Sequence, residues 1–412
     1  MANTTLTADI IAKEAVMILE NSLVMAKKVY RGYESEFDKK VNGYEVGETI
    51  SIRRPADFEV TDGATMNVQD VVEGKLSLTV NTRKHIAWKF TSQDLTMKIG
   101  DLGDRVMKPA LVQLANKIDK DVMALYKKVP NWVGTPGEKI NSFADFSKMP
   151  ERLDEFAVPQ DDLSAVLSPS DHWGLLGSQT ALFIQDAAKG AYRSASLGMI
   201  GGVDTYMSQN VPTHTVGAHG GTPLVKGASQ NVTYDSVKND YKQSLSTDGW
   251  TASIGLKAGD VFTIADVYAV NPIGKEKLSF LRQFVILEDV TTNASTSTDS
   301  PLSIYPPIIT SGPFQTVDSV PANDAAITMV GTASTGYRQN MTFHKNAFTL
   351  AMVPLVAPPG AVDVGRRTHK GITVRVIPVY DGVSDESRWR LDVLYGVQAI
   401  DPRLAVRGSG TA

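Results

Sequence analysis

Apolar side chains recur at helical spacing near the beginning of the chain. Between Thr7 and Lys28 the repeat is carried by Ile11, Ala15, Ile18 and Leu19. Thr7 can cap the first turn, and the lysines at the end of the segment suit the negative end of the helix dipole. The pattern predicts a helix over 7–28. It is either an amphipathic helix on its own domain or an arm that packs on a neighbour.

From Val41 to Phe90 the apolar period changes to that of strands. Thr49 to Ile52 predicts one strand, and Leu76 to Val80 alternates apolar with polar residues as a half-exposed strand does. The segment between them, Arg53 to Gly74, is polar and rich in turn residues. We therefore predict a long hairpin. A loop of this length usually has a function, and an ordinary surface hairpin is the alternative.

The strongest helical pattern runs from Asp101 to Lys128. Its apolar positions keep steps of three and four residues: Leu111, Leu114, Ile118, Val122 and Leu125. Pro109 suits the first turn, so the regular part of this helix is expected to begin near it.

A mixed pattern follows the long helix. We predict a helix over Phe143 to Phe156, a buried strand over Leu163 to Leu167 and a short helix over Pro169 to Leu176. Leu182 to Val216 is rich in glycine and small residues and reads as loops. The succession of helices and strands predicts an α+β fold.

The composition shifts near Gly220 and shifts back near Gly336. Between them helix formers are scarce, and short strand patterns appear at Val261 to Ala269 and Phe280 to Leu287. We interpret this stretch as an inserted β-rich domain. Its polar loops, Val232 to Asp248 and Thr291 to Pro301, are expected to project into solvent or toward a partner. The parent domain then resumes with strands at Ala347–Val356, Ile372–Tyr380 and Arg388–Val397.

Composition narrows the class of protein. With 412 residues, more than one packing unit is expected. The net charge of -4 argues against a protein whose main task is gripping nucleic acid. The absence of cysteine excludes disulfides and thiolate sites. Charges interrupt Met1 to Tyr30, so we expect no signal peptide, no membrane role and use in the cytosol.

Sites for chemistry are hard to find in this sequence. No phosphate-binding loop, nucleophile elbow or zinc-protease motif occurs. His214 and His219 lie close in sequence, but their spacing on a glycine-rich loop does not favour a metal site. Adjacent carboxylates such as Asp161-Asp162 and Asp385-Glu386 are expected to be solvated. We therefore expect no catalytic residue, no cofactor and no metal, and an enzyme with a β-rich accessory domain is the weakest alternative.

Several segments resemble one family of coat proteins. The C-terminal run from Trp389 to Arg403 is similar to the closing segment of coat proteins of P22-like tailed phages. Leu256 to Ile264 is similar to a strand of that family's inserted domain. Asp94 to Val129 is similar to its long helix, and Tyr337 to Phe348 to its return from the insertion. The similar segments occur in the order expected for the family.

The resemblance implies a Hong Kong 97-type capsid fold with an inserted, β-barrel-like domain. Carried over by position, it divides the chain into six parts. They are an N-terminal arm (1–30), an extended loop with flanking strands (31–100), a peripheral domain with a spine helix (101–160), the first part of an axial domain (161–219), the insertion (220–336), and the return to the axial and peripheral domains (337–412).

Charged residues in loops are the candidate contacts between subunits, since guanidinium groups bind carboxylates well and charge complementarity orients partners. In the extended loop the candidates are Arg53, Arg54, Asp57, Glu59, Lys75 and Arg83. In the family a loop of the insertion bridges neighbouring capsomers, and Tyr234 to Ser246 is its counterpart here, with Asp235, Lys238, Asp240 and Lys242. Arg366 and Arg367 complete the set, with a solvated turn as the alternative for each arginine pair.

The resemblance also implies partners and a location. The chain would self-assemble as hexamers and pentamers into the icosahedral head of a tailed double-stranded DNA phage, first as a procapsid on a scaffolding protein with a portal at one vertex. Weak contacts with packaged DNA and a decoration protein are further partners that it allows. The protein would be made in the host cytoplasm and end in the virion. A tail tube or an encapsulin-like compartment is the alternative.

Overall fold

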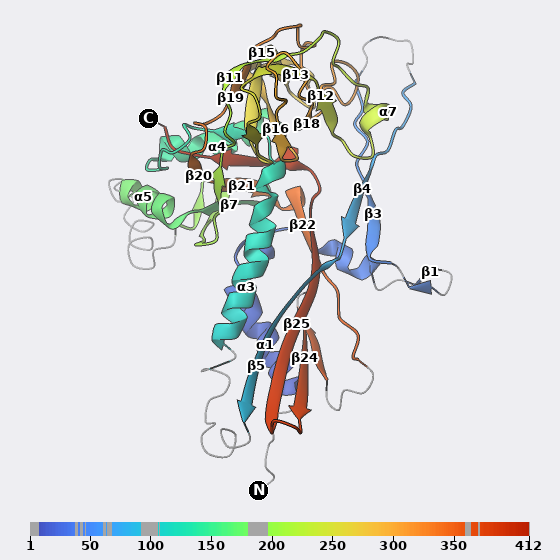
Figure 1. The fold of residues 1–412 in the computed structure, drawn as a ribbon, viewed down its shortest axis with the longest axis vertical. Helices are drawn as coiled ribbons and strands as arrows, with labels where there is room; N and C mark the ends of the chain where they lie inside the picture. Colours follow the sequence, from blue (N-terminus) through green and yellow to red (C-terminus); the bar gives the residue numbers. More distant parts are fainter. Residues whose placement is uncertain are drawn as a thin grey trace. The chain divides into compact units, whose positions relative to one another are not determined.

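The computed structural model describes residues 8–37, 40–41, 44–45, 47–60, 63, 68–91, 106, 108–179, 197–358, 364–369 and 371–411. The chain forms two compact units (Figure 1). The first comprises Met1–Ser51, Ser77–Val122 and Phe348–Gln398, and the second comprises Ile52–Leu76, Met123–Ala347 and Ala399–Ala412. Each unit therefore draws on three separate stretches of sequence.

The first unit is built on a sheet with long strands. The strand order is β22 (Phe348–Met352), β25 (Glu386–Ala399), β24 (Ile372–Asp381) and β23 (Gly365–His369), and β5 (Thr82–Thr91) also pairs with β25. Helix α1 (Ala8–Ser22) packs against β23 and β24. Of its predicted apolar positions, Ile11, Ala15 and Leu19 are buried and Ile18 is partly exposed. The N-terminal helix therefore packs within its own unit.

The observed N-terminal helix is shorter than the helix predicted over 7–28. It stops at Ser22, and a 3-10 turn, η1 (Met25–Lys27), follows. The carboxylate of Asp119 accepts the backbone N–H groups of Val24 (2.7 Å) and Ala26 (3.0 Å). Because a side chain from the long helix satisfies these amides, the chain leaves the helical path before Lys28.

The long helix, α3, spans Lys108–Met123 and continues as a 3-10 turn, η4 (Ala124–Lys128). Pro109 lies in its first turn, as predicted. Residues 101–105 and 107 of the predicted helix lie outside the described residues. Further along the chain, α4 (Phe143–Glu155), β7 (Leu163–Leu167) and α5 (Pro169–Gln179) confirm the three elements predicted there.

A six-stranded sheet forms one part of the second unit. Its order is β6 (Trp132–Val133), β26 (Ala405–Gly408), β21 (Asn340–His344), β7, β9 (Val203–Met207) and β8 (Met199–Ile200). Strand β21 runs antiparallel to both β7 and β26, while β7 is parallel to β9 and β26 to β6. Helix α4 packs on β26 through apolar side chains such as Phe146 and Met149. Ser142 caps α4 by accepting the N–H of Asp145 at 3.1 Å.

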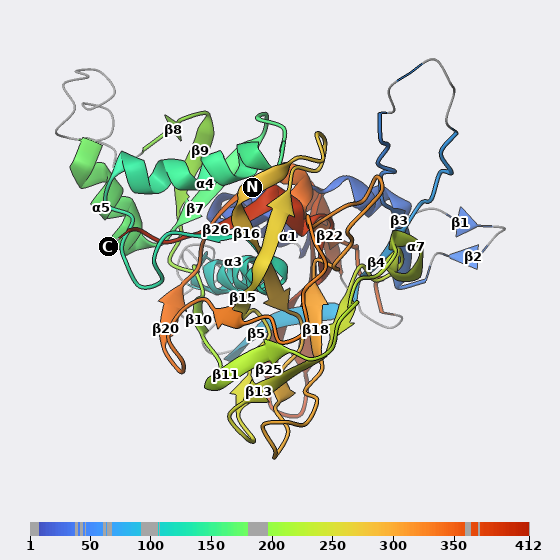
Figure 2. The same cartoon turned by 90° about the horizontal axis from the view of Figure 1, so that it is seen from above.

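The predicted β-rich stretch contains only strands and one short helix among its regular elements (Figure 2). A five-stranded sheet has the order β12 (Gln243–Leu245), β18 (Leu302–Tyr305), β16 (Lys277–Ile286), β15 (Val261–Val270) and β19 (Ile327–Met329). Three strand pairs accompany it: β11 (Gly221–Val225) with β13 (Thr247–Trp250), β14 (Gly255–Leu256) with β17 (Val290–Thr291), and β10 (Thr213–Thr215) with β20 (Gly336–Arg338). A bridge between Leu224 and Ala326 joins β11 to the segment before β19, and Val225, Phe262, Phe284 and Ile327 belong to one buried apolar cluster. The whole chain is thus mixed α+β.

Candidate subunit-contact surface

Two short strands carry the extended loop. Strands β3 (Thr49–Arg53) and β4 (Lys75–Thr79) pair, and the N–H of Arg54 donates to the carbonyl of Gly74 at 2.8 Å. The N–H of Val80 donates to Glu48 at 2.8 Å, so the strands run in opposite directions. The predicted hairpin is therefore confirmed. A pair of shorter strands, β1 (Lys40–Val41) and β2 (Tyr44–Glu45), precedes it.

The described part of the loop leaves large apolar side chains in solvent. Phe58 is 60% exposed and Val60 is 93% exposed, and Val68 and Val71 are also exposed. Isolated exposed apolar residues are common, but four on one loop form a surface that another molecule can cover. The carbonyl and N–H of Glu59 both bond to the side chain of Gln69, which holds the two sides of the loop together.

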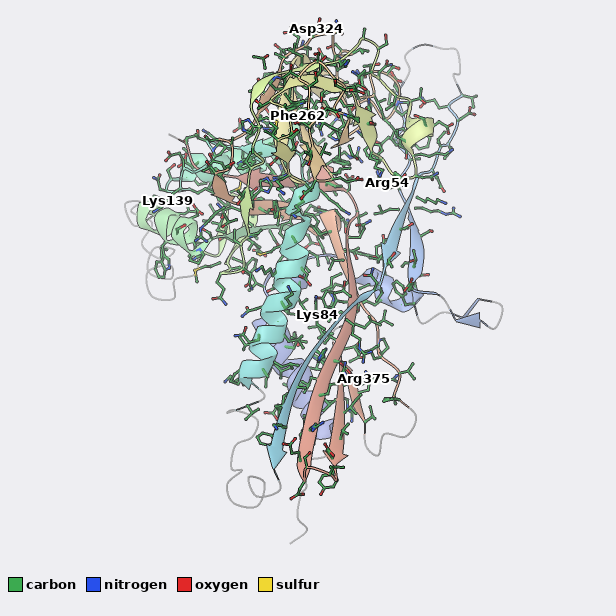
Figure 3. All side chains as sticks on the ribbon, viewed as in Figure 1. Arg54, Lys84, Lys139, Phe262, Asp324 and Arg375 are labelled. Carbon is green, nitrogen blue, oxygen red and sulfur yellow. The ribbon has the colours of Figure 1, made fainter. Side chains whose placement is uncertain are left out.

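The charged candidates of this loop divide into two groups. The Arg53 side chain is 81% exposed and pairs with Glu73 at 3.2 Å. Glu59 and Lys75 are also exposed. Arg54, labelled in Figure 3, and Asp57 instead have partners in their own chain. The Arg54 guanidinium lies 4.7 Å from the centre of the Tyr241 ring, and Asp57 pairs with Arg403 at 3.5 Å. Arg53, Glu59 and Lys75 therefore face solvent, as does Arg83 on β5.

The extended loop contacts Tyr234–Ser246, the segment predicted to bridge capsomers. The prediction that this segment is a solvated polar loop is wrong. The segment contains helix α7 (Tyr234–Val237) and β12, and Tyr234 and Tyr241 are buried. The Tyr234 ring stacks on Phe314 with centroids 3.4 Å apart. The buried rings of Tyr234 and Tyr241 hold the segment against the fold. The prediction failed because it followed the average polarity of the segment, in which these two residues are widely spaced among charges.

The charged residues of this segment remain on the surface. Lys238 pairs with Asp235 at 2.6 Å, and Lys242 pairs with Glu288 at 3.4 Å. Asp240 is exposed. Such exposed pairs contribute little to stability, so these side chains are available to a partner. By contrast, Thr291 to Pro301 is largely exposed from residue 293 to 298, as predicted.

The remaining candidates lie in the first unit. Arg83 on β5 pairs with the buried Asp392 at 3.3 Å, where Arg375 (2.5 Å) and Arg390 (2.7 Å) also bind. Burial alone would raise the pKa of Asp392, but the guanidinium groups of Arg375 and Arg390 hold it below its ordinary value. Arg83 is thus part of a structural ion-pair cluster. Arg366 and Arg367 are exposed on β23, paired through their backbones with Arg375 and Val374.

An ion pair near the end of the chain holds the base of the loop, and the sequence analysis did not single it out. Arg403 forks onto Asp401, with Nη2 2.8 Å and Nε 3.0 Å from its carboxylate oxygens. Burial would raise the pKa of Asp401, but the charge of Arg403 and its hydrogen bonds keep that pKa low. Asp401 in turn raises the pKa of Arg403. The signal in the sequence was Asp401-Pro402-Arg403, which opens the turn η6 (Pro402–Leu404).

In the residues that the structure describes, no group of three or more His, Asp or Glu side chains is arranged to hold a metal ion. None of the helices described is long and apolar enough to cross a membrane. His214 lies buried between Tyr126 (3.0 Å) and Asp260 (2.8 Å), so it links elements of the second unit and does not pair with His219.

The family model described as "P22 coat protein - gene protein 5" matches residues 1–409. The chain belongs to the P22 coat protein family. It is therefore a major capsid protein of a tailed phage, and members of this family associate with themselves to form a shell and are components of the virion. Its mixed α+β architecture agrees with the fold class predicted from the sequence.

Solved structures similar to the chain include capsid proteins. A structure of Mycobacterium phage Che8 is 13% identical, covers 93% of this chain and 90% of its own, and has a TM-score of 0.48. The capsid of Ralstonia phage GP4 is 8% identical, covers 89% and 85%, and has a TM-score of 0.42. The CUS-3 coat protein I-domain is 25% identical over 27% of this chain and 98% of its own, with a TM-score of 0.20. No curated protein matches the sequence.

Proposed function

We propose that this P22-family coat protein assembles as hexamers and pentamers into the icosahedral head of a tailed double-stranded DNA phage. Subunits first form a procapsid on a scaffolding protein, with a portal at one vertex, and the shell expands as DNA enters. Assembly takes place in the host cytoplasm, and the protein has no catalytic role. The six sequence ranges given above remain our proposal for the domain organisation.

The observation that carries this proposal is the exposure of apolar side chains on the extended loop. Phe58, Val60, Val68 and Val71 lie on a hairpin that buries little of its own surface. Burying apolar area contributes about 25 cal/mol per Å², and a shell repeats the same contact around every ring of subunits. A loop whose apolar side chains stay exposed in one chain is therefore suited to bury them against a neighbouring copy.

The exposed charged residues are our candidates for orienting that contact. On the loop they are Arg53, Glu59 and Lys75, and on the inserted segment they are Asp235, Lys238, Asp240 and Lys242. Arg366 and Arg367 on β23 form a third candidate patch. Charge complementarity at the rim of an interface mainly sets orientation and association rate. Arg54, Asp57 and Arg83, which have intrachain partners, are proposed to support these surfaces from beneath.

Electron microscopy of the purified protein, expressed with and without a scaffolding protein, tests the proposal. We expect closed round shells of uniform size when the scaffolding protein is present and irregular particles or free subunits without it. Tubes would instead indicate a tail protein, and small shells filled with cargo would indicate a storage compartment. Particles that have the same diameter before and after DNA packaging would contradict the expansion step.

A further inference from the structure

One arginine of the inserted sheet is buried without an acceptor for its charge. Arg282 on β16 is 3% exposed. Within the described part of the chain its guanidinium makes no hydrogen bond, and its Nε is buried without a partner. Its closest recorded contact is the Phe156 ring, whose centre lies 4.8 Å from Cζ. Buried charged groups are normally paired or hydrogen-bonded because desolvating them is unfavourable.

Two other arginines of the same unit, the buried Arg407 and the partly exposed Arg403, show what the fold usually provides. Arg407 is also buried, and it donates to the carbonyls of Val129 (2.9 Å) and Gly259 (2.8 Å) and to Gln339 (3.3 Å). Arg403 binds Asp401 through both sides of its fork. The lack of acceptors at Arg282 is therefore a local feature of its site.

Arg282 faces a small cavity whose lining carries excess positive charge. The cavity has a volume of about 10 Å³ and is lined by Asp57, Phe156, Val270, Pro272, Lys275, Arg282, Pro313, Phe314, Gln315, Thr316 and Arg403. Lys275, Arg282 and Arg403 supply three positive charges, and Asp57 supplies one negative charge, which pairs with Arg403 at 3.5 Å. Lys275 is held in place because its Nζ donates to the carbonyls of Pro272 and Pro313. Two positive charges thus lack a counter-charge in the lining.

We propose that this cavity is a binding site for a small monatomic anion, with chloride as the natural ligand. The space beside Arg282 is narrow, which favours a monatomic anion over the larger sulfate, phosphate and organic carboxylates. The guanidinium of Arg282, whose Nε has no protein acceptor, supplies the donor. Lys275 supplies further positive charge, whereas the charge of Arg403 is balanced by Asp401 and Asp57. Burial lowers the pKa of Arg282 to about 10, as expected for a cation that its own protein neutralises poorly.

The anion would join parts of the chain that are distant in sequence. Lys275 lies in the turn between β15 and β16, Arg403 lies near the chain's C-terminal strand, and Asp57 lies at the base of the extended loop. An anion beside Arg282 offsets the repulsion among these cations and leaves Arg403 free to hold Asp57. Chloride is therefore expected to stabilise the second unit, including the attachment of the loop.

Thermal unfolding of the purified, unassembled full chain tests the site directly. The protein is compared in potassium chloride and in potassium gluconate at equal ionic strength, because gluconate is too large for the cavity. At a chloride concentration ten times the Kd we expect a rise in Tm of about 2 to 4 °C. Chloride NMR line broadening by the protein provides a second readout of binding.

The Arg282→Met variant keeps much of the side-chain volume but removes the charge. It is expected to lose both the chloride-dependent rise in Tm and the line broadening, while its Tm in gluconate is no lower than that of the unchanged protein. Arg338→Met, at an exposed arginine of β20, is the matched control and should keep both responses. Lys275→Met, in which a lining cation is removed, provides the same test if Arg282→Met fails to fold.

Each result decides the matter. Equal Tm values in chloride and gluconate would overturn the proposal and indicate that water alone serves Arg282. A chloride response that survives both Arg282→Met and Lys275→Met would place the anion elsewhere and also overturn it. Loss of the response in both variants, with Arg338→Met unaffected, supports the site.

Discussion

The extended loop and the inserted sheet treat their apolar side chains in opposite ways. Phe262 and Phe284 on β15 and β16 are completely buried, with ring centroids 5.6 Å apart. Phe58 on the loop is 60% exposed. The same residue type therefore contributes to folding in one region and stays exposed in the other. Phe262 and Phe284 are buried because their strands have neighbours on both sides in the sheet. The residue type alone does not decide whether the ring is buried.

The largest expected effect comes from removing a core ring. Phe262→Ala, at the position labelled in Figure 3, should lower the free energy of unfolding by about 3 to 5 kcal/mol. The lost side chain leaves a cavity that the surrounding strands cannot fill. Chemical denaturation followed by tryptophan fluorescence measures the change. Phe58→Ala is the matched control, and it should change stability by less than about 0.5 kcal/mol. Similar losses in both variants would erase the distinction between the regions.

A buried carboxylate in the first unit adds a pH-dependent effect of intermediate size. Burial raises the pKa of Asp119 from 3.8 to about 6, although the amides of Val24 and Ala26 oppose the shift. A raised pKa means that the folded state binds the proton more tightly, so the stabilisation is complete below pH 3.8 and is lost as pH rises through about 6. The loss should be at most about 3 kcal/mol.

The Asp119→Asn variant isolates this effect because asparagine does not titrate. It should be less stable than the unchanged protein at low pH, since one amide loses its acceptor. The stability difference between the unchanged protein and the variant should shrink as pH rises from 4 to 7. Urea unfolding at a series of pH values measures it. Parallel curves for the two proteins would show that Asp119 keeps an ordinary pKa.

A charge on the loop should separate assembly from folding. Val60→Asp places a carboxylate at a side chain that is 93% exposed, so stability should change by less than about 0.5 kcal/mol. Shell formation should fall strongly, because a buried unpaired charge would be desolvated in the contact. Light scattering during scaffold-assisted assembly measures this. Ile273→Asp, at another exposed apolar side chain, is the control. Normal assembly of Val60→Asp would remove the loop from the proposed interface.

The smallest effect is expected from a single rim charge. Arg53→Glu replaces an exposed partner of Glu73 and should leave stability almost unchanged, while slowing assembly in a manner that salt reduces. Arg53→Lys should assemble normally. Arg54 is not a clean site for such a test, because its guanidinium packs on Tyr241. An assembly rate of Arg53→Glu that is independent of salt would argue against an electrostatic role.

Periodicity predicted most regular elements well. The strand at Leu163–Leu167, the helix from Phe143 and the strands on both sides of the inserted turn lie where apolar spacing placed them. It failed where a distant side chain changed local structure, as when Asp119 ended the N-terminal helix early. Such contacts join residues that no local window contains.

The candidate contact surface was only partly predictable. Exposed charges such as Arg53 and Lys242 behave as their polarity suggested. Arg54 and Arg83 do not, because each meets a partner that only the tertiary fold supplies. The buried Arg282 could not be anticipated at all, since an arginine on an alternating strand is expected to face solvent.

The five-stranded and the six-stranded sheets of the second unit differ in how far apart their strands lie along the chain. Strands β15 and β16 are joined by a short turn and pair through Val261 and Val285. The six-stranded sheet instead places β26 between β6 and β21, and pairs Arg407 with Trp132 and Met341. Closing long loops slows folding. The inserted sheet is therefore expected to form early and on its own, whereas the six-stranded sheet can close only after β26 arrives, which makes that step the slow one in producing a subunit able to assemble.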